Sequence, residues 1–140
     1  MAVVIAIAVS VVLFVIGLIH VYWFLGGRWG VSVVIPMRDN KRLFTPTKSA
    51  TLVVVLLLWL TAFLLLAQTG LVNSGLPAWI PLWCSWCAAI VLYLRVIGDF
   101  HWLGLFKRET TSAFATYDTR VFVPLCFLLA SGIVIVLVNT

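Results

Sequence analysis

Two histidines occupy matching places in the chain, each close to the end of a long apolar segment. His20 ends the first apolar run, and His101 follows the third. Two imidazoles facing each other across a helix bundle could ligate haem iron, and an imidazole can also carry protons near neutral pH. The alternative is two interfacial histidines, each bonded to a backbone carbonyl or a nearby acid. His20 shares a helical stripe with Gly17 and Gly27, and this predicts that it faces other helices.

A CSWC tetrapeptide, running from Cys84 to Cys87, lies within the third apolar run. Two cysteines at this spacing form the redox motif of thiol oxidoreductases, so a membrane thiol or quinone oxidoreductase is an alternative function. Such an enzyme needs a second cysteine pair for exchange, and Cys126 is predicted near the opposite face of the membrane. We therefore interpret Cys84 and Cys87 as small, adaptable residues of the helix core.

Charged residues surround the third connection between apolar runs. Asp99 is predicted in the last turn of the third helix and Arg120 in the first turn of the fourth, where the helix dipole disfavours each charge. A mutual salt bridge would resolve both placements, and Arg95, one turn before Asp99, could share the carboxylate. We expect a cluster that fixes the hairpin. Ligand binding is the alternative, because ionisable groups in a membrane are functional candidates.

Several kinds of catalytic motif are absent from the sequence. It has no phosphate-cradling glycine loop, no HExxH or other clustered metal-ligand spacing, and no serine nucleophile elbow. We therefore assign no catalytic residue and no metal site, and haem between His20 and His101 is the one cofactor left as an alternative. These absences favour a binding protein over an enzyme.

The composition places the chain in a membrane. Of its 140 residues, 64% are hydrophobic and 9% are charged, whereas a soluble domain carries roughly 25% charged residues. Each apolar run approaches the ~20 residues that cross a bilayer. The first run lacks the basic start of a signal peptide and is expected to remain as a span. We predict one all-α membrane domain over residues 1–140, an up-and-down bundle of four transmembrane helices over residues 3–25, 50–70, 77–97 and 119–138.

The basic residues fix the expected orientation. All nine Lys and Arg lie between Arg28 and Lys48 or between Arg95 and Arg120, and the middle connection has none. The positive-inside rule therefore predicts that the first and third connections are cytoplasmic, with both termini outside a cell (inner) membrane. This pattern explains the net charge of +5 by topology, so no nucleic-acid partner is predicted.

The two halves of the chain share a weak internal similarity. Residues 43–54 and 113–124 align without gaps, which places Phe44 over Phe114 and Lys48 over Asp118. The bundle could therefore consist of two degenerate parallel hairpin repeats, related by an axis along the membrane normal.

The two basic segments also carry a family resemblance. The pattern HxYWxxGGRWG after the first run, and a series of polar residues in fixed order after the third, resemble the domain of unknown function 3995 family, which consists of small four-span membrane proteins, mainly bacterial. The match covers nearly the whole chain. It implies a four-span fold and no established activity. The residues that carry it are His20, Trp23, Gly26, Gly27, Arg28, Gly98, Asp99, Gly104, Phe106, Lys107, Arg108, Phe114, Asp118, Thr119 and Arg120.

These observations favour a binding or accessory module with a polar cluster at the cytoplasmic side. Arg and Lys beside aromatic rings at headgroup depth suit an anionic lipid-like ligand, and a protein partner is the alternative occupant. The lipid bilayer itself is a partner, and assembly into a homo-oligomer is left open. The expected cluster comprises His20, Trp23, Arg28, Arg95, Asp99, His101, Lys107, Arg108, Asp118 and Arg120.

Overall fold

The computed structural model describes residues 1–39, 41–108 and 110–140, and most of them are helical. Within these residues, four helical segments are long and apolar enough to cross a membrane. The chain is therefore an all-α membrane protein, as the sequence predicts. The four segments are α1 (Ala2–Phe24), α3 (Lys48–Gln68), α4 (Trp79–Ile97) and a continuous helix made of α5 (Ala113–Tyr117), the π-helical η1 (Asp118–Phe122) and α6 (Val123–Val138).

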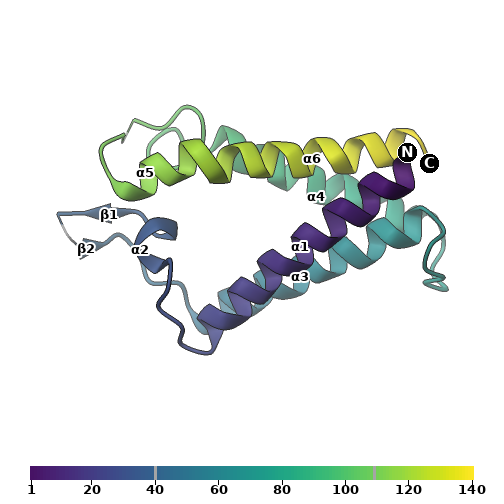
Figure 1. Cartoon of the computed structure of the whole chain (residues 1–140), viewed down its shortest axis with the longest axis horizontal. Coiled ribbons are helices and arrows are strands. Elements are labelled where there is room, and N and C mark those ends of the chain that lie inside the picture. The colour runs from purple at the N-terminus through teal and green to yellow at the C-terminus, as the bar shows by residue number, and fades with distance from the viewer. Residues whose placement is uncertain (40, 109) are drawn as a thin grey trace.

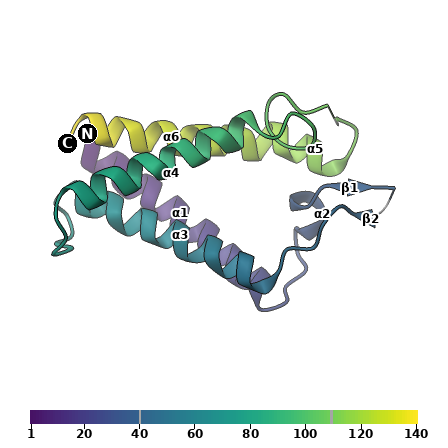
Figure 2. The same cartoon turned by 180° about the vertical axis from the view of Figure 1, so that it is seen from behind.

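The four segments form two helical hairpins (Figure 1). Helix α1 packs mainly on α3, and α4 mainly on α6, while contacts of α1 with α6 and of α3 with α4 join the hairpins. Both termini lie at one end of the molecule, and the hairpins diverge toward the other end, as Figure 2 shows from behind. We call this second end the basic end, because its connections and the adjoining helix turns contain the Lys and Arg residues.

The core of the bundle lies in the half nearer the termini. Ala6 of α1, Ala62 of α3 and Ala89 of α4 are buried there, and such small residues let helix backbones approach closely in a membrane. Leu65 and Ile133 fill the space between the helices and are fully buried. The hairpins are therefore held together at this end, and their separation at the basic end leaves room for the connecting segments.

Short elements of the first connection lie at the basic end. Helix α2 (Val31–Val34) precedes a small antiparallel hairpin of β1 (Met37–Arg38) and β2 (Lys41–Arg42), in which Met37 pairs with Arg42. This hairpin is an addition to the expected all-α fold. Helix α2 contacts α5, so the first connection reaches the second helical hairpin and bridges the divergent ends.

The π-helical turn of η1 has a local cause. Pro124 follows it at the start of α6, where it can donate no backbone hydrogen bond and would clash with the carbonyl of Arg120 in a regular α-helix. One wider turn before the proline lets the helix continue without that clash. The fourth helix begins at Ala113, six residues earlier than the predicted residue 119, because Ser112 caps it by accepting the N–H of Ala115. Asp118, on this added part of the helix, is buried.

Candidate functional site

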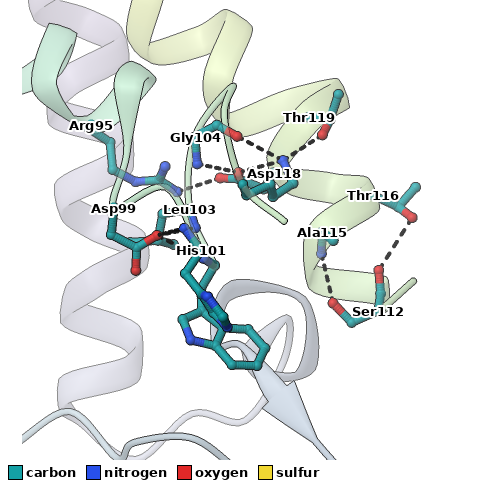
Figure 3. A network of polar contacts seen from close by, with 12 residues as sticks. Arg95, Asp99, His101, Leu103, Gly104, Ser112, Ala115, Thr116, Asp118 and Thr119 are labelled. Carbon is teal, nitrogen blue, oxygen red and sulfur yellow. Dashed lines mark hydrogen bonds and ion pairs between the residues drawn. The ribbon is translucent and has the colours of Figure 1, made fainter. Parts of the chain in front are cut away.

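The carboxylate of Asp118 is the centre of a buried polar cluster, drawn in Figure 3. Its side chain is fully buried. Oδ1 accepts a hydrogen bond of 2.6 Å from Nη2 of Arg95 on α4, and Oδ2 accepts one of 2.9 Å from the backbone N–H of Gly104. Oδ2 also accepts a bond of 3.0 Å from Nζ of Lys107. One carboxylate therefore joins α4, the 98–112 connection and the fourth helix.

Lys107 is almost as deeply buried as its partner. Only 4% of its side chain is exposed. Its ammonium group donates to the carbonyl of Gly104 at 3.1 Å and to Oγ1 of Thr119 at 2.6 Å, as well as to Asp118. A buried ammonium group needs such a complete set of acceptors, because burial removes its hydration. We call Arg95, Gly104, Lys107, Asp118 and Thr119 the Asp118 cluster.

Two glycines let the connection fold tightly against the end of α4. Gly98 and Gly104 adopt φ values of 80° and 86°. A Cβ atom on either would overlap backbone of the other strand of this loop, at Leu103 and Ile97 respectively. The close approach allows Leu105 to donate its N–H to the carbonyl of Val96 at 2.8 Å, and it places Gly104 where its own N–H reaches Asp118.

Asp99 is not paired with Arg120, so this sequence-based interpretation was wrong. Oδ1 of Asp99 accepts the backbone N–H groups of His101, Trp102 and Leu103 at 3.0, 2.7 and 2.9 Å. Desolvation raises the pKa of Asp99, but the N–H bonds from Leu103, His101 and Trp102 together outweigh it and hold the pKa below its usual range. Asp99 therefore stabilises the turn that follows α4.

The reason for the error lies in the helix boundaries. Helix α4 ends at Ile97, so Asp99 is beyond the helix dipole and close to unpaired N–H groups of its own turn. Arg120 lies in the π-helical turn rather than at a helix start, and its side chain is exposed. Across the described residues, no ion pair joins Arg120 to Asp99, and Arg95 pairs with Asp118 instead.

A separate pocket of about 310 Å³ lies within the first hairpin at the basic end. It is bounded by the end of α1, by α2 and by the segment from β2 to the start of α3. Arg42 supplies a cation to this pocket, and among the described lining residues there is no Asp or Glu. We call it the Arg42 pocket, and it is lined by His20, Trp23, Gly27, Val31, Val34, Ile35, Arg42, Phe44, Thr45, Pro46 and Thr51.

His20 is held in place at this pocket by its own helix. Its Nδ1 lies 2.8 Å from the carbonyl oxygen of Ile16, which can only accept, so Nδ1 carries the proton and donates. The Nε2 atom is therefore left for another partner. The ring also packs edge-on against Trp23, at 5.0 Å between ring centroids. Trp23 in turn donates from Nε1 to the carbonyl of Trp29 at 2.8 Å.

The residues of the expected single cluster fall into separate groups. Arg95, Lys107 and Asp118 come together, and His20 and Trp23 line the Arg42 pocket. Asp99 accepts backbone hydrogen bonds in the turn after α4. In the same turn, the exposed ring of His101 lies beside that of Trp102, with 4.7 Å between the ring centroids. His101 is not among the described residues of the Arg42 pocket, so the two histidines do not share this site. The side chains of Arg28, Arg108 and Arg120 are exposed.

Arg42, Gly104 and Thr119 were missing from the predicted polar cluster. Arg42 was counted only as one topology signal among several, and its distance from His20 in the sequence gives no sign of their shared pocket. The Gly104 contribution is a backbone N–H, which no side-chain pattern reveals. The adjacent Asp118 and Thr119 could have indicated a polar pair, because both approach the same ammonium group.

Cys84 and Cys87 are exposed, so their expected place in the helix core was wrong. The buried face of α4 is formed by Pro81, Ser85 and Ala89, which follow one another at intervals of four residues. At this spacing, the two cysteines point away from the bundle. Both are free thiols in the structure.

Comparison with known proteins identifies a family for this chain. The family described as "Protein of unknown function (DUF3995)" matches residues 13–133, which is most of the chain and includes both the Asp118 cluster and the Arg42 pocket. No curated protein and no solved structure matches the chain.

Proposed function

The chain belongs to the DUF3995 family of proteins of unknown function, and we propose that it binds an anionic amphiphile, such as a phospholipid headgroup, in the Arg42 pocket. The observation that carries this proposal is the composition of the pocket. It joins the guanidinium of Arg42 and the hydroxyl-bearing Thr45, and its described lining has no carboxylate to repel an anion. The Nε2 atom of His20 can accept a hydrogen bond from a hydroxyl of the headgroup.

The size and place of the pocket support a headgroup rather than a larger ligand. A volume of about 310 Å³ is at the lower end of the range for small-molecule sites, roughly 300–1,000 Å³. The pocket lies where α1 ends, beside Trp23, and tryptophan favours the headgroup depth of a bilayer. On the proposed topology this is the cytoplasmic leaflet, where anionic lipids attract basic residues.

The Asp118 cluster is less suited to hold such a ligand. Both carboxylate oxygens of Asp118 and the ammonium group of Lys107 are already engaged with protein partners. An anion would have to compete with a fully buried carboxylate for Arg95 and Lys107. We therefore assign this cluster a structural role, in which it fixes the 98–112 connection to α4 and the fourth helix, and we place ligand binding in the first hairpin.

Native mass spectrometry of the protein from nanodiscs with phosphatidylglycerol and phosphatidylcholine tests the proposal. We expect the wild type to retain phosphatidylglycerol, and Arg42→Gln to lose most of it. Lys41→Gln is the matched control, because it removes the same charge from the adjacent residue, which does not line the pocket. Equal retention by Arg42→Gln and the wild type would refute the proposed site.

A further inference from the structure

The exposed apolar surface of α4 does not stop where the helix ends. Leu94 and Ile97 are exposed on the last turns of this membrane-spanning helix, and Phe100, Leu105 and Phe106 continue the surface along the connection. The last three side chains are each about 60% exposed, at 59%, 59% and 61%. The rings of Phe100 and Phe106 stack with centroids 6.0 Å apart. Phe100, Leu105 and Phe106 therefore extend the exposed apolar sequence of α4, and the bond from the N–H of Leu105 to the carbonyl of Val96 holds the connection against the last turn of that helix.

Five consecutive backbone N–H groups of this connection have partners inside the protein. Every backbone N–H from His101 through Leu105 donates to a partner inside the protein. The acceptors are the Asp99 carboxylate for the first three, the Asp118 carboxylate for Gly104 and the carbonyl of Val96 for Leu105. Loops in water leave many such donors to the solvent. Internal partners for the His101–Leu105 N–H groups lower the cost of placing this part of the chain against lipid, because an unsatisfied N–H there costs several kcal/mol.

The conformation of Phe100 gives a second, independent indication. It has a φ of 62°, in the left-handed region that a bulky side chain rarely adopts. Such strain persists only where surrounding structure imposes it, and it is concentrated at functional positions. Here the Asp99 turn and the flanking Gly98 impose it. The outcome is an aromatic ring that is exposed and stacks on Phe106 instead of packing into the bundle.

The two basic residues at the end of this connection, Lys107 and Arg108, differ in their exposure. Lys107, next to Phe106, is withdrawn into the Asp118 cluster, and only 4% of its side chain is exposed. Arg108 is exposed and follows it directly. A guanidinium beside an apolar patch complements anionic headgroups, while its aliphatic stem can lie along the acyl region. The burial of Lys107 removes one charge from the surface beside Phe106, while the carboxylate of Asp99 is engaged with three N–H groups of the loop.

We propose that the segment from Gly98 to Arg108, which we call the aromatic loop, is embedded in the membrane interface, with Phe100, Leu105 and Phe106 in contact with lipid. Asp99 and Asp118 then have a shared purpose, because each carboxylate replaces water for backbone N–H groups of the loop. The occupant of the patch is bilayer lipid. This inference is independent of ligand binding at the Arg42 pocket, which belongs to the other hairpin.

Spin labels on single cysteines test this placement in the full-length protein. The three native cysteines are first replaced by alanine, and Phe106→Cys or Leu105→Cys is labelled in liposomes of phosphatidylcholine with phosphatidylglycerol. Collisions of the label with oxygen, which concentrates in lipid, are compared with collisions with a water-soluble nickel complex. Lys41→Cys, exposed on the β-hairpin, is the control for a position in water.

We expect the oxygen-to-nickel collision ratio at both loop positions to be several-fold higher than at Lys41→Cys. Because both side chains are exposed, the labels should not disturb folding, and an unchanged melting temperature of each labelled protein verifies this. A ratio equal to that of the control at both positions would overturn the proposal. The patch would then face water and would have to be covered by a protein partner or a second copy of the chain.

Discussion

The Nζ atom of Lys107 lies 3.0 Å from Oδ2 of Asp118, and the two side chains are 4% and 0% exposed. The same carboxylate binds Arg95 at 2.6 Å through its other oxygen. Two cations thus share one buried anion, which leaves this part of the cluster with a net positive charge. The carboxylate is needed for stability, because without it Lys107 would be buried with no counter-charge and the partly buried Arg95 would lose its ion-pair partner.

Removal of this carboxylate should destabilise the protein severely. We expect Asp118→Asn to lower the free energy of unfolding by about 3 kcal/mol or more, the usual cost of breaking a buried ion pair at one partner. Thermal unfolding in detergent measures the loss. Asp39→Asn serves as the control, since the side chain of Asp39 is 91% exposed, and it should change little.

The double variant Asp118→Asn with Lys107→Met tests whether the loss of stability in Asp118→Asn comes from the unpaired charge of Lys107. Removal of both partners takes away the uncompensated ammonium group, so we expect part of the stability lost in Asp118→Asn to return. Strict additivity of the two single effects would show that Lys107 and Asp118 do not interact as the structure indicates.

Substitution of Gly104 tests the tight packing of the aromatic loop against α4. In Gly104→Ala, the new methyl group would overlap the carbonyl of Ile97 at a φ of 86°. Gly70→Ala is a matched control, because Gly70 has a similar φ of 77° but no atom within 4 Å of the new methyl group. The control should cost only the left-handed strain, about 1 kcal/mol. Equal melting temperatures for the two variants would contradict the described packing.

The transmembrane architecture could be predicted from the sequence, and the reason is physical. Spans depend on length and hydropathy, which are local properties, so the four helices follow from the apolar runs. The partners of Asp99 and Asp118 could not be predicted from these local properties. They depend on where α4 ends and on one π-helical turn, and a shift of a few residues exchanges an inward for an outward side chain.

Aligned positions of the two halves of the chain differ in their burial, which the sequence pattern does not predict. Phe44 and Phe114 occupy matching places in the internal alignment, yet Phe44 is 52% exposed and Phe114 is 2% exposed. Lys48 is exposed at the start of α3, whereas the matching Asp118 is buried. Similar sequence therefore does not give similar environments here, because the two connections fold differently around their helix ends.

The Asp99 turn should respond to pH in a defined direction. The pKa of Asp99 is lowered on folding, so its contribution to stability is fully present above the unfolded pKa of about 3.9 and is lost as pH falls through the lower, folded value. We expect Asp99→Ala to cost about 1 kcal/mol at pH 7, as the loss of a capping side chain does. The difference in melting temperature between this variant and the wild type should shrink in acid. A constant difference between pH 7 and pH 3 would refute the role of the carboxylate.

Leucine substitutions on α4 should report which side of the helix is packed. Ser85 is fully buried and Cys84 beside it is exposed. We expect Ser85→Leu to cost roughly 1–3 kcal/mol by overpacking, and Cys84→Leu to stay within about 0.5 kcal/mol of the wild type. The reverse order in thermal unfolding would place the cysteines in the core.

Thiol trapping in cells tests the alternative function as an oxidoreductase, which requires that Cys84 and Cys87 form and break a disulfide. Two cysteines that stay reduced throughout would exclude it.

The distribution of the basic residues and the termini predicts the orientation of the protein in the membrane. The basic residues gather at one end of the molecule, and both termini lie at the other (Figure 1). By the positive-inside rule, a reporter fused after Thr140 should be active outside the cytoplasm, and one inserted beside Lys41 should be active inside it. An alkaline phosphatase fusion and a fluorescent protein fusion measure the two locations. If the fusion after Thr140 were cytoplasmic, the orientation would be reversed, and the Arg42 pocket and the aromatic loop would both face the outer leaflet.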